Sequence, residues 1–336
     1  MGNTELLAAL AAVGLSLGLL YSSRRHERTK RVKALAKVKA LAKRGIVQTS
    51  LGGIGYRAAG GKTEHLTPIV CFHMSPRSSD EYEEAMTSLE YGGRRVIAVD
   101  EPGYGMSDNP PASCTLDEIA DAFMEVLNAC GVDRFVAVGS LMGCYFVASL
   151  ASRYPHRVVA CAFTNLYWAG SNATASAKPD PGPAIGTPIP DSWQIKSDGS
   201  HLTELFTRRS AWLDPLLNTR VVRDQLVYLL NRKSRYEKGI WIEDASAYDL
   251  SAKARRISCP TLCIRGEMAA AHFDKIGLEG TSRFAAAEAL LNQPETLVLK
   301  GSGSSVNLVN QQAVAWAEAI VGFVRRQDGD ETSCTK

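Results

Sequence analysis

The sequence contains no C-x-x-C pair, and its eight cysteines and six histidines show no spacing typical of a zinc site. Most of the cysteines lie inside apolar runs, which is the pattern of buried thiols in a reducing compartment. This pattern argues against a disulfide framework, and we expect neither a metal ion nor another cofactor.

Positive charge is scarce outside one short segment. The chain has 336 residues and a formal net charge of +3, yet residues 24–44 hold ten Lys and Arg against a single acid, Glu27. Residues 45–336 together carry a charge of −5. Such a body lacks the basic face that nucleic acid binding requires, so we expect no nucleic acid partner.

The length allows two domains, or one large α/β domain with an insertion. Hydrophobic residues make up 45% of the chain and charged residues 22%. These are the values of a folded globular protein, and they exclude a mostly disordered or fibrous chain.

Residues 6–21 form an apolar run without any charge. A helix over this run spans about 24 Å, somewhat less than a hydrocarbon core of about 30 Å. No basic residue precedes the run and ten follow it, so the positive-inside rule places the body in the cytosol. We therefore expect residues 1–23 to be a single-pass signal anchor. The alternatives are a targeting segment for a mitochondrion or plastid, and an interfacial helix that does not span.

The basic segment 24–44 contains a direct repeat, VKALAK, at 32–37 and again at 38–43. Ala, Leu and Lys favour a helix, and lysines around its apolar face can reach anionic lipid headgroups. We expect membrane lipid to be a partner of residues 5–44. A solvated helical linker is the alternative for the repeat.

Six short apolar runs rich in β-branched residues predict strands buried in a parallel sheet. They cover residues 67–74, 94–100, 133–140, 157–165, 260–267 and 295–302. Helix-like stretches lie between them, at 80–90, 115–130, 143–154, 282–292 and 310–326. This alternation predicts a doubly wound α/β fold, in which ligands bind at the carboxyl ends of the strands.

The segments that follow these strands carry motifs in a characteristic order. They are His73, DEPGYGMSD at 100–108, VGSLMG at 138–143, PTLCIRGE at 260–267, and the stretch 300–323 that begins KGSGSS. Together they resemble the α/β-hydrolase superfamily over most of residues 50–326.

The resemblance implies an α/β-hydrolase core formed by residues 45–165 and 259–327. Residues 166–258 occupy the place of a cap insertion, with a Pro/Gly/Ser-rich loop followed by two amphipathic helices that break near Pro215. Residues 328–336 are expected to be a disordered tail.

The positions of a Ser-His-Asp triad are all substituted. Gly139 and Gly143 frame the tight turn that carries the nucleophile in this superfamily, and the residue at its centre is Leu141, which cannot attack a carbonyl. Ala269 stands where the acid is expected, and Ser304 stands where the histidine is expected. The resemblance therefore implies no catalytic residue of this type.

Two neighbours of these positions are weaker candidates. Ser140 lies one residue before the turn, where it would point away from the tip. Asn165 occupies a second location that the superfamily uses for its acid.

The resemblance also implies an oxyanion hole. The backbone N–H of Met142 would supply one donor, and Met74 or Ser75 would supply the other from the loop that begins at His73. Such donors can hold a carbonyl or carboxylate without turning it over. His73 has a structural interpretation as well, in which its side chain fixes the loop.

Other candidates for ligand contact are His201 and Trp168, with Trp193 beside the same loop. His201 precedes a cap helix, where a capping or surface role is the alternative. His272 lies near the vacated acid position, but no residue pairs with it by spacing.

These observations predict a membrane-anchored protein with an α/β-hydrolase fold and no triad. Its expected role is that of a non-catalytic binding or assembly (scaffold) subunit, with a protein partner or a small carbonyl or carboxylate ligand. The alternative is a hydrolase or lyase that acts on a small ester or carbonyl substrate through another constellation, such as His73 with a cap residue.

Overall fold

The computed structural model describes residues 43–329 except 62–65, 91–92, 169–194, 211–214, 244, 246–247, 276 and 278. The predicted anchor 1–23, nearly all of the basic segment, and Trp193 lie outside the described residues and stay predictions. Within the described ranges, no helix is both long enough and apolar enough to cross a membrane.

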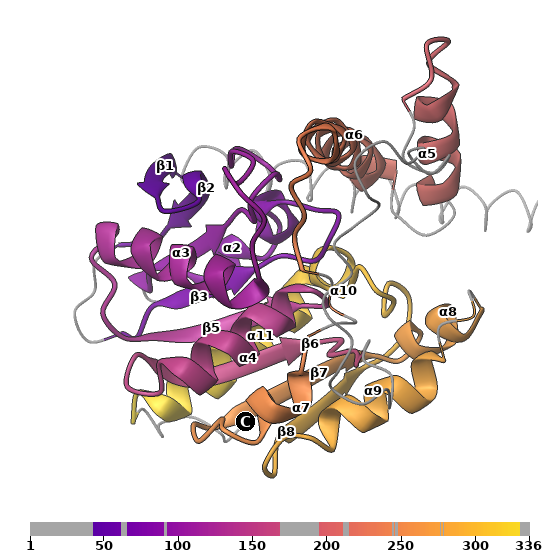
Figure 1. The fold of residues 1–336 in the computed structure, drawn as a ribbon. Helices are drawn as coiled ribbons and strands as arrows, with labels where there is room; N and C mark the ends of the chain where they lie inside the picture. Colours follow the sequence, from indigo (N-terminus) through magenta and orange to yellow (C-terminus); the bar gives the residue numbers. More distant parts are fainter. Residues whose placement is uncertain are drawn as a thin grey trace, which may run out of the picture. The chain divides into compact units, whose positions relative to one another are not determined.

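Eight strands form one sheet in the order β1-β2-β4-β3-β5-β6-β7-β8 (Figure 1). Their bounds are β1 Lys43–Thr49, β2 Gly52–Ala59, β3 Ile69–Phe72, β4 Val96–Val99, β5 Phe135–Ser140, β6 Val158–Thr164, β7 Thr261–Gly266 and β8 Glu295–Leu299. Six of these strands, β4, β3, β5, β6, β7 and β8 in sheet order, pair in parallel, and they are the six predicted strands. The α/β fold with a mostly parallel sheet is confirmed.

The hairpin of β1 and β2 was not predicted from the sequence. It pairs antiparallel within itself and with β4. β1 is largely exposed and β2 contains three glycines and a buried arginine, so neither strand shows the continuous apolar run that marked the others. β1 begins at Lys43, so the last two residues of the basic segment 24–44 belong to this strand.

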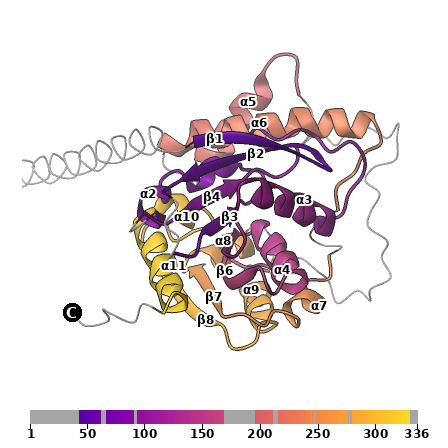
Figure 2. The same ribbon diagram turned by 90° about the vertical axis from the view of Figure 1, so that its left-hand side faces the viewer.

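Helices cover both faces of the sheet (Figure 2). α3 (Leu116–Ala129) and α4 (Gly143–Arg153) pack together on one face, and α2 (Met86–Leu89) and α11 (Ala313–Gln327) pack together on the other. The remaining short elements are η1 (Ser79–Tyr82), α7 (Leu250–Ala254), α8 (Ala269–Lys275), α9 (Gly280–Glu288) and α10 (Leu308–Gln311). The predicted helix at 80–90 is therefore two short ones, η1 and α2.

Aromatic side chains fill the core between the sheet and α3 and α4. The ring centroid of Phe123 lies 5.2 Å from that of Phe72 and 5.1 Å from that of Phe146. On the other face, the buried Trp316 donates a hydrogen bond of 2.8 Å from Nε1 to the Thr164 hydroxyl. This bond satisfies the indole N–H inside the core, at the carboxyl end of β6.

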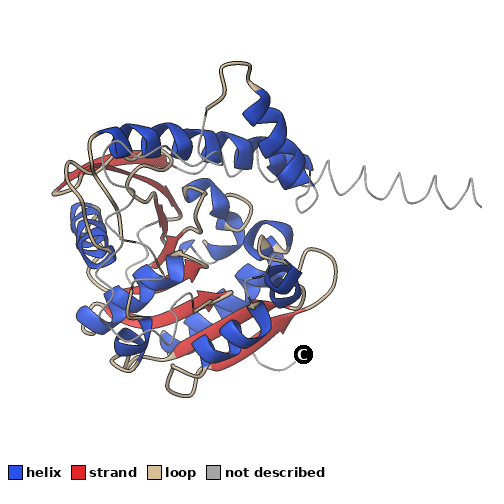
Figure 3. Ribbon diagram, turned by 45° about the vertical axis from the view of Figure 1, so that its right-hand side comes forward, coloured by secondary structure: helices blue, strands red, loops and turns tan. Residues whose placement is uncertain are grey.

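The cap contains the two predicted helices, α5 (Ser200–Ser210) and α6 (Pro215–Glu237), which pack against each other (Figure 3). α6 begins at the expected proline, whose fixed φ suits the first position of a helix. Arg220 of α6 forms ion pairs with Glu83 and Glu84 of the segment after η1, and Arg223 pairs with Asp80. The Arg220 pairs have little exposure to solvent and Arg223 is half exposed, so both buried and partly exposed ion pairs join the cap to the core.

Asp328, the first residue of the predicted disordered tail, is ordered, and residues 330–336 lie outside the described residues. The carboxylate of Asp328 accepts a hydrogen bond of 2.5 Å from Arg94 and one of 3.2 Å from the backbone N–H of Thr67. Both the Arg94 and Asp328 side chains are buried, so this pair fixes the end of α11 to the start of the core strands.

Candidate functional site

Leu141 occupies the tip of a strand-to-helix turn between β5 and α4. Its φ is +46°, the left-handed conformation that a leucine rarely adopts. A Cβ atom at Gly143 would collide with the carbonyl oxygen of Phe72, and one at Gly139 would collide with the backbone of Gly143. The turn therefore has the geometry of a nucleophile elbow, as the glycine spacing predicts, with an aliphatic side chain at its tip.

Asn165 follows β6 and connects the end of β7 to the loop after β8. Its Oδ1 accepts a hydrogen bond of 3.0 Å from the N–H of Gly266, and its Nδ2 donates one of 3.4 Å to the carbonyl of Ser305. The N–H of Leu141 donates to the carbonyl of Thr164, one residue before Asn165. The vacated nucleophile position, the second acid location and the histidine loop therefore meet at one end of the sheet.

Ser304 and Ala269 are both buried at this end of the sheet. The Ser304 hydroxyl donates a hydrogen bond of 2.7 Å to the carbonyl of Gly301, and its own carbonyl accepts one from the N–H of Met268. The hydroxyl is thus used to close its own turn. Ala269 begins α8 and presents no polar group.

His73 is completely buried, and its side chain contacts backbone on both sides. Nδ1 donates a hydrogen bond of 3.0 Å to the carbonyl of Met74, and Nε2 accepts one of 3.0 Å from the N–H of Glu101. Burial lowers the pKa of this imidazole, which keeps it neutral. These contacts favour the structural interpretation, in which His73 holds the β3 loop against the β4 loop.

One of the expected oxyanion donors is occupied from within the chain. The N–H of Met74 donates a hydrogen bond of 2.7 Å to Oε2 of Glu81, which lies on η1. The other donor, Met142, is the N-cap residue of α4, so its N–H is not needed for hydrogen bonds within the helix. Of the two amides that were predicted as donors in this loop, that of Met74 is therefore engaged by a carboxyl group, which leaves Ser75 as the other candidate.

Glu81 is fully buried, and burial raises its pKa to about 7, although the nearby Arg77 charge lowers it in part. Its second oxygen, Oε1, and the hydroxyl of Ser140 are both buried and lack a hydrogen-bond partner of good geometry. The Ser140 hydroxyl nevertheless lies close enough to lower the pKa of Glu81. Ser140 therefore faces this carboxyl group inside the fold.

Glu101, the first residue of the β4 loop after Asp100, is a second buried carboxyl group. It accepts a hydrogen bond of 3.0 Å from the Ser75 hydroxyl, and burial raises its pKa to about 8. Sequence reasoning missed both Glu81 and Glu101. The acidic run SSDEYEE directly after the oxyanion loop was the available signal, because carboxylates so near a buried strand end need partners.

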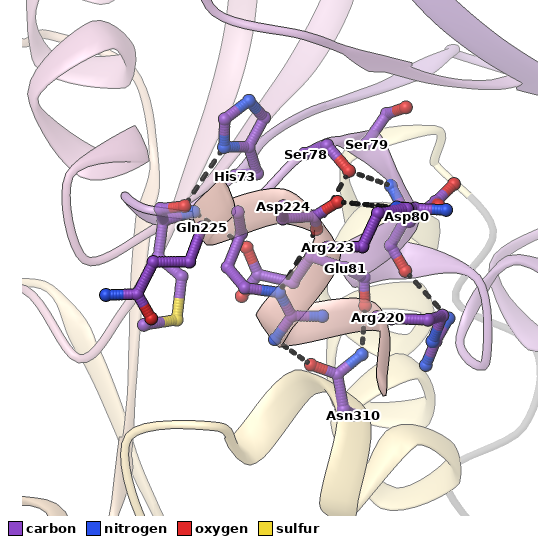
Figure 4. Close-up of polar contacts among 12 residues, drawn as sticks. His73, Ser78, Ser79, Asp80, Glu81, Arg220, Arg223, Asp224, Gln225 and Asn310 are labelled. Carbon is purple, nitrogen blue, oxygen red and sulfur yellow. Dashed lines mark hydrogen bonds and ion pairs between the residues drawn. The ribbon is translucent and has the colours of Figure 1, made fainter. Parts of the chain in front are cut away.

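A buried polar cluster lies around this loop, and Figure 4 shows Ser78, Asp224 and Asn310 among its members. Arg77 connects these residues. Its Nη1 donates a hydrogen bond of 3.0 Å to Oδ1 of Asn310, and its Nε lies 3.7 Å from Oδ2 of Asp224 on α6. Asp224 in turn accepts a hydrogen bond of 3.1 Å from the hydroxyl of Ser78. The cluster thus links the oxyanion loop, the histidine loop and the cap.

The weaker candidates lie apart from this cluster. His201 is buried near the start of α5, where its Nδ1 accepts a hydrogen bond from the N–H of Lys196, so it closes a turn. Trp168 packs partly buried against the core, and its carbonyl accepts a hydrogen bond from Arg283. Neither contact connects these residues to Leu141.

Comparison with known proteins identifies the fold. Residues 67–186 match the sequence model of the alpha/beta hydrolase fold family. The bromoperoxidase of Bacillus anthracis superposes with a TM-score of 0.62 at 18% identity, over 84% of this chain and 100% of that one. The chain has the α/β-hydrolase fold.

Sequence relatives match over shorter segments. The chain is 34% identical to bifunctional epoxide hydrolase 2 of Sus scrofa over 112 residues, which is 32% of this chain and 20% of that protein. It is 35% identical to the bifunctional esterase/perhydrolase DCH of Acinetobacter calcoaceticus over 94 residues, which is 28% of this chain and 34% of that protein. The matches thus cover about a third or less of the length of these relatives.

Proposed function

We propose that the protein is a non-catalytic member of the superfamily, which binds a ligand or a partner through the site that its relatives use for hydrolysis. The observation that carries this proposal is Leu141 at the tip of an intact elbow. A leucine offers no atom that can form a covalent intermediate with a carbonyl, so the Ser-His-Asp reaction has no first step.

Two further contacts support the proposal. The base position holds Ser304, whose hydroxyl closes its own turn and cannot accept a proton near neutral pH. The N–H of Met74 is already bonded to Glu81. When Glu81 is ionised, its charge also opposes the developing negative charge of an oxyanion in that place.

The alternative function is a hydrolase with another constellation, and one observation favours it. The relatives include an epoxide hydrolase and an esterase, and this site contains two carboxyl groups with pKa values near 7 and 8, Glu81 and Glu101. Carboxyl groups with such pKa values are suited to general acid–base work. Their burial and their hydrogen bonds to the loop nevertheless favour a positioning role.

We further propose that residues 6–21 anchor the protein in a membrane with its body in the cytosol. The support is the uncharged apolar run followed by the basic segment 24–44. Membrane extraction tests the anchor, and the assay of ester hydrolysis tests the loss of catalysis. Both are set out in the Discussion.

A further inference from the structure

Two cysteine side chains are in contact where the chain leaves the core for the cap insertion and returns from it. Sγ of Cys161 lies 3.5 Å from Sγ of Cys259. Cys161 is on β6, and Cys259 lies two residues before β7, the neighbouring strand of the sheet (Figure 1). The N–H of Cys161 donates a hydrogen bond of 2.9 Å to the carbonyl of Pro260, the residue after Cys259. The pairing of these two strands therefore holds the thiols together.

The distance between the sulfurs is short enough for a disulfide to form with a small movement. A disulfide has an S–S length of about 2.05 Å, so the two sulfurs must approach by about 1.5 Å. Cys161 is fixed within a strand, whereas Cys259 lies in the segment between α7 and β7. The approach therefore falls on the side of Cys259, outside the regular sheet.

The two thiols differ in their exposure to solvent. Cys161 is fully buried in the apolar core, whereas Cys259 is partly exposed, and its neighbours Ser258 and Pro260 are exposed. A small oxidant in the solvent therefore meets Cys259 first, and Cys161 lies directly behind it.

The two thiols also differ in acidity. The hydrogen bond from Cys161 lowers the pKa of Cys259, whereas burial raises the pKa of Cys161 well above its ordinary value. The thiolate is the reactive form of cysteine, and here its formation is favoured on the exposed partner. A partly exposed thiol of lowered pKa beside a second cysteine is the arrangement that redox-sensing sites use.

The other cysteines among the described residues differ from this pair. Four of them are buried, with pKa values raised by burial: Cys71, Cys114, Cys144 and Cys263. Cys130 is partly exposed, but its thiol lies beside the side chain of Tyr56. Cys130 therefore matches Cys259 in exposure without the contact to a second sulfur that Cys259 has.

We propose that Cys161 and Cys259 are an oxidation site, at which hydrogen peroxide converts the two thiols into a disulfide. The thiolate of Cys259 attacks one oxygen of the peroxide, so an S–O bond forms, the O–O bond breaks, and the leaving hydroxide takes up a proton. Sγ of Cys161 then attacks the sulfur of this sulfenic acid. The S–S bond forms, the S–O bond breaks, and the second hydroxide leaves as water with the proton of Cys161. The two thiols lose two electrons, and the peroxide gains them as it becomes two molecules of water.

The disulfide closes a loop of chain that contains the whole cap insertion. Cys161 and Cys259 are 98 positions apart, and residues 166–258 lie between them. A cross-link over so long a loop restricts the unfolded chain strongly, so the oxidised protein resists unfolding more than the reduced protein. Such a bond is reversible and agrees with thiols that are reduced at rest in a reducing compartment. The inference does not depend on the proposed loss of catalysis.

The test is treatment of the reduced full chain with hydrogen peroxide under native conditions. Free thiols are then blocked with N-ethylmaleimide, and the cysteines are mapped by peptide mass spectrometry. We expect a disulfide between Cys161 and Cys259, and its return to two thiols with dithiothreitol. Failure of this bond to form would overturn the proposal, as would a bond from Cys259 to Cys334 or to a second chain in its place.

Three variants assign the roles of the two sulfurs. Cys259→Ser is expected to abolish the bond, and Cys161→Ala is expected to accumulate a sulfenic acid at Cys259 that dimedone traps, because the second thiol is missing. Cys130→Ser is the matched control and should form the bond as readily as the unaltered chain. Circular dichroism checks the folding of each variant. A sulfenic acid at Cys161 rather than Cys259 would overturn the proposed order of attack.

Urea unfolding then shows whether the bond fits the native fold. Oxidation is expected to raise the midpoint of the unaltered chain by about 1 M and to leave that of Cys259→Ser unchanged. A midpoint of the unaltered chain that fails to rise would show that the bond strains the sheet, and would overturn the site as a feature of the folded protein.

Discussion

The carboxyl group of Glu81 accepts a hydrogen bond of 2.7 Å at Oε2 from the backbone N–H of Met74. In an active α/β-hydrolase fold, an amide in this loop is expected to face the substrate. Here the amide faces the protein's own side chain, which comes from η1 only seven residues later. One of the two candidate oxyanion donors of this loop is therefore already used within the protein.

The first prediction concerns hydrolysis. The full chain is expected to hydrolyse p-nitrophenyl acetate no faster than buffer and to remain unlabelled by a serine-directed fluorophosphonate, because Leu141 presents no attacking oxygen. Spectrophotometry and mass spectrometry of the labelled protein provide the measurements. Stoichiometric labelling of Ser140 would contradict the assignment of the elbow.

A second prediction concerns restoration of the triad. Combining Leu141→Ser, Ala269→Asp and Ser304→His is expected to give at most trace esterase activity, because catalytic geometry must be held within about 0.5 Å. Adding Glu81→Leu to these three changes frees the Met74 amide and is expected to raise the rate further. The comparison between the triple and quadruple variants isolates the oxyanion donor. Equal rates in the two would show that the Met74 amide does not contribute.

A third prediction concerns pH. The pKa of Glu81 in the folded protein is about 7, above the value of about 4.3 for an unfolded chain. Between these values the folded protein binds more protons than the unfolded one, so the free energy of unfolding falls as pH rises from about 4.5 to about 7. The contribution is complete below the lower value and lost above the upper one, and it amounts to at most about 4 kcal/mol.

Urea unfolding of Glu81→Gln across this pH range tests the assignment. The difference between the unaltered chain and the variant should decline through the window and then stay constant. Glu318→Gln, at an exposed position of α11, is the matched control and is expected to show no such trend. A difference that does not vary with pH would rule out the raised pKa.

A fourth prediction concerns the attachment of the cap. Arg220 pairs with Glu83 and Glu84, whose carboxylates are nearly inaccessible to solvent. Replacing it by methionine removes one partner from each of these buried carboxylates, while Arg57 still pairs with Glu83 and Asn310 still donates to Glu84. We expect a loss of about 3 kcal/mol in the free energy of unfolding. Arg255→Met, at an exposed position after α7, should change it by less than about 0.5 kcal/mol. Similar losses in the two variants, measured by urea unfolding, would contradict a structural role of the cap ion pairs.

The last prediction concerns the membrane. The protein is expected to resist alkaline extraction, to carry no glycan at the sequon Asn172-Ala173-Thr174, and to lose its body to protease added outside intact vesicles. Deletion of residues 1–23 should release most of it, with residual binding that weakens as salt rises. A body protected from protease would refute the cytosolic assignment. A mature chain shortened within an organelle would identify residues 1–44 as a cleaved targeting segment.

The sequence was informative wherever local pattern determines structure. Buried parallel strands read as continuous apolar runs, so all six of them could be recognised. The elbow could be recognised as well, because Gly139 and Gly143 leave no room for a Cβ atom. The break between α5 and α6 followed from Pro215.

The remainder depends on contacts between distant residues. β1 is exposed and β2 contains glycines, so no local sequence pattern indicates either strand. They form because β1 pairs with β2 and β2 pairs with β4. The bond from Met74 to Glu81 and the approach of Arg77 to Asp224 join separate loops and the cap. Hydrophobic periodicity says nothing about such polar contacts, so the buried cluster could be found only in the folded structure.

Asn165 links the segments at the carboxyl ends of three strands, β6, β7 and β8. Its φ of +51° suits asparagine, and its amide uses both of its functions, accepting from Gly266 and donating to Ser305. An ionised acid in this position accepts hydrogen bonds but donates none, so a catalytic carboxylate could not hold both loops. The asparagine that removes acid chemistry from this position thus also holds the ends of these strands together. The Gly266 amide hydrogen should therefore exchange with solvent deuterium only when these strand ends separate.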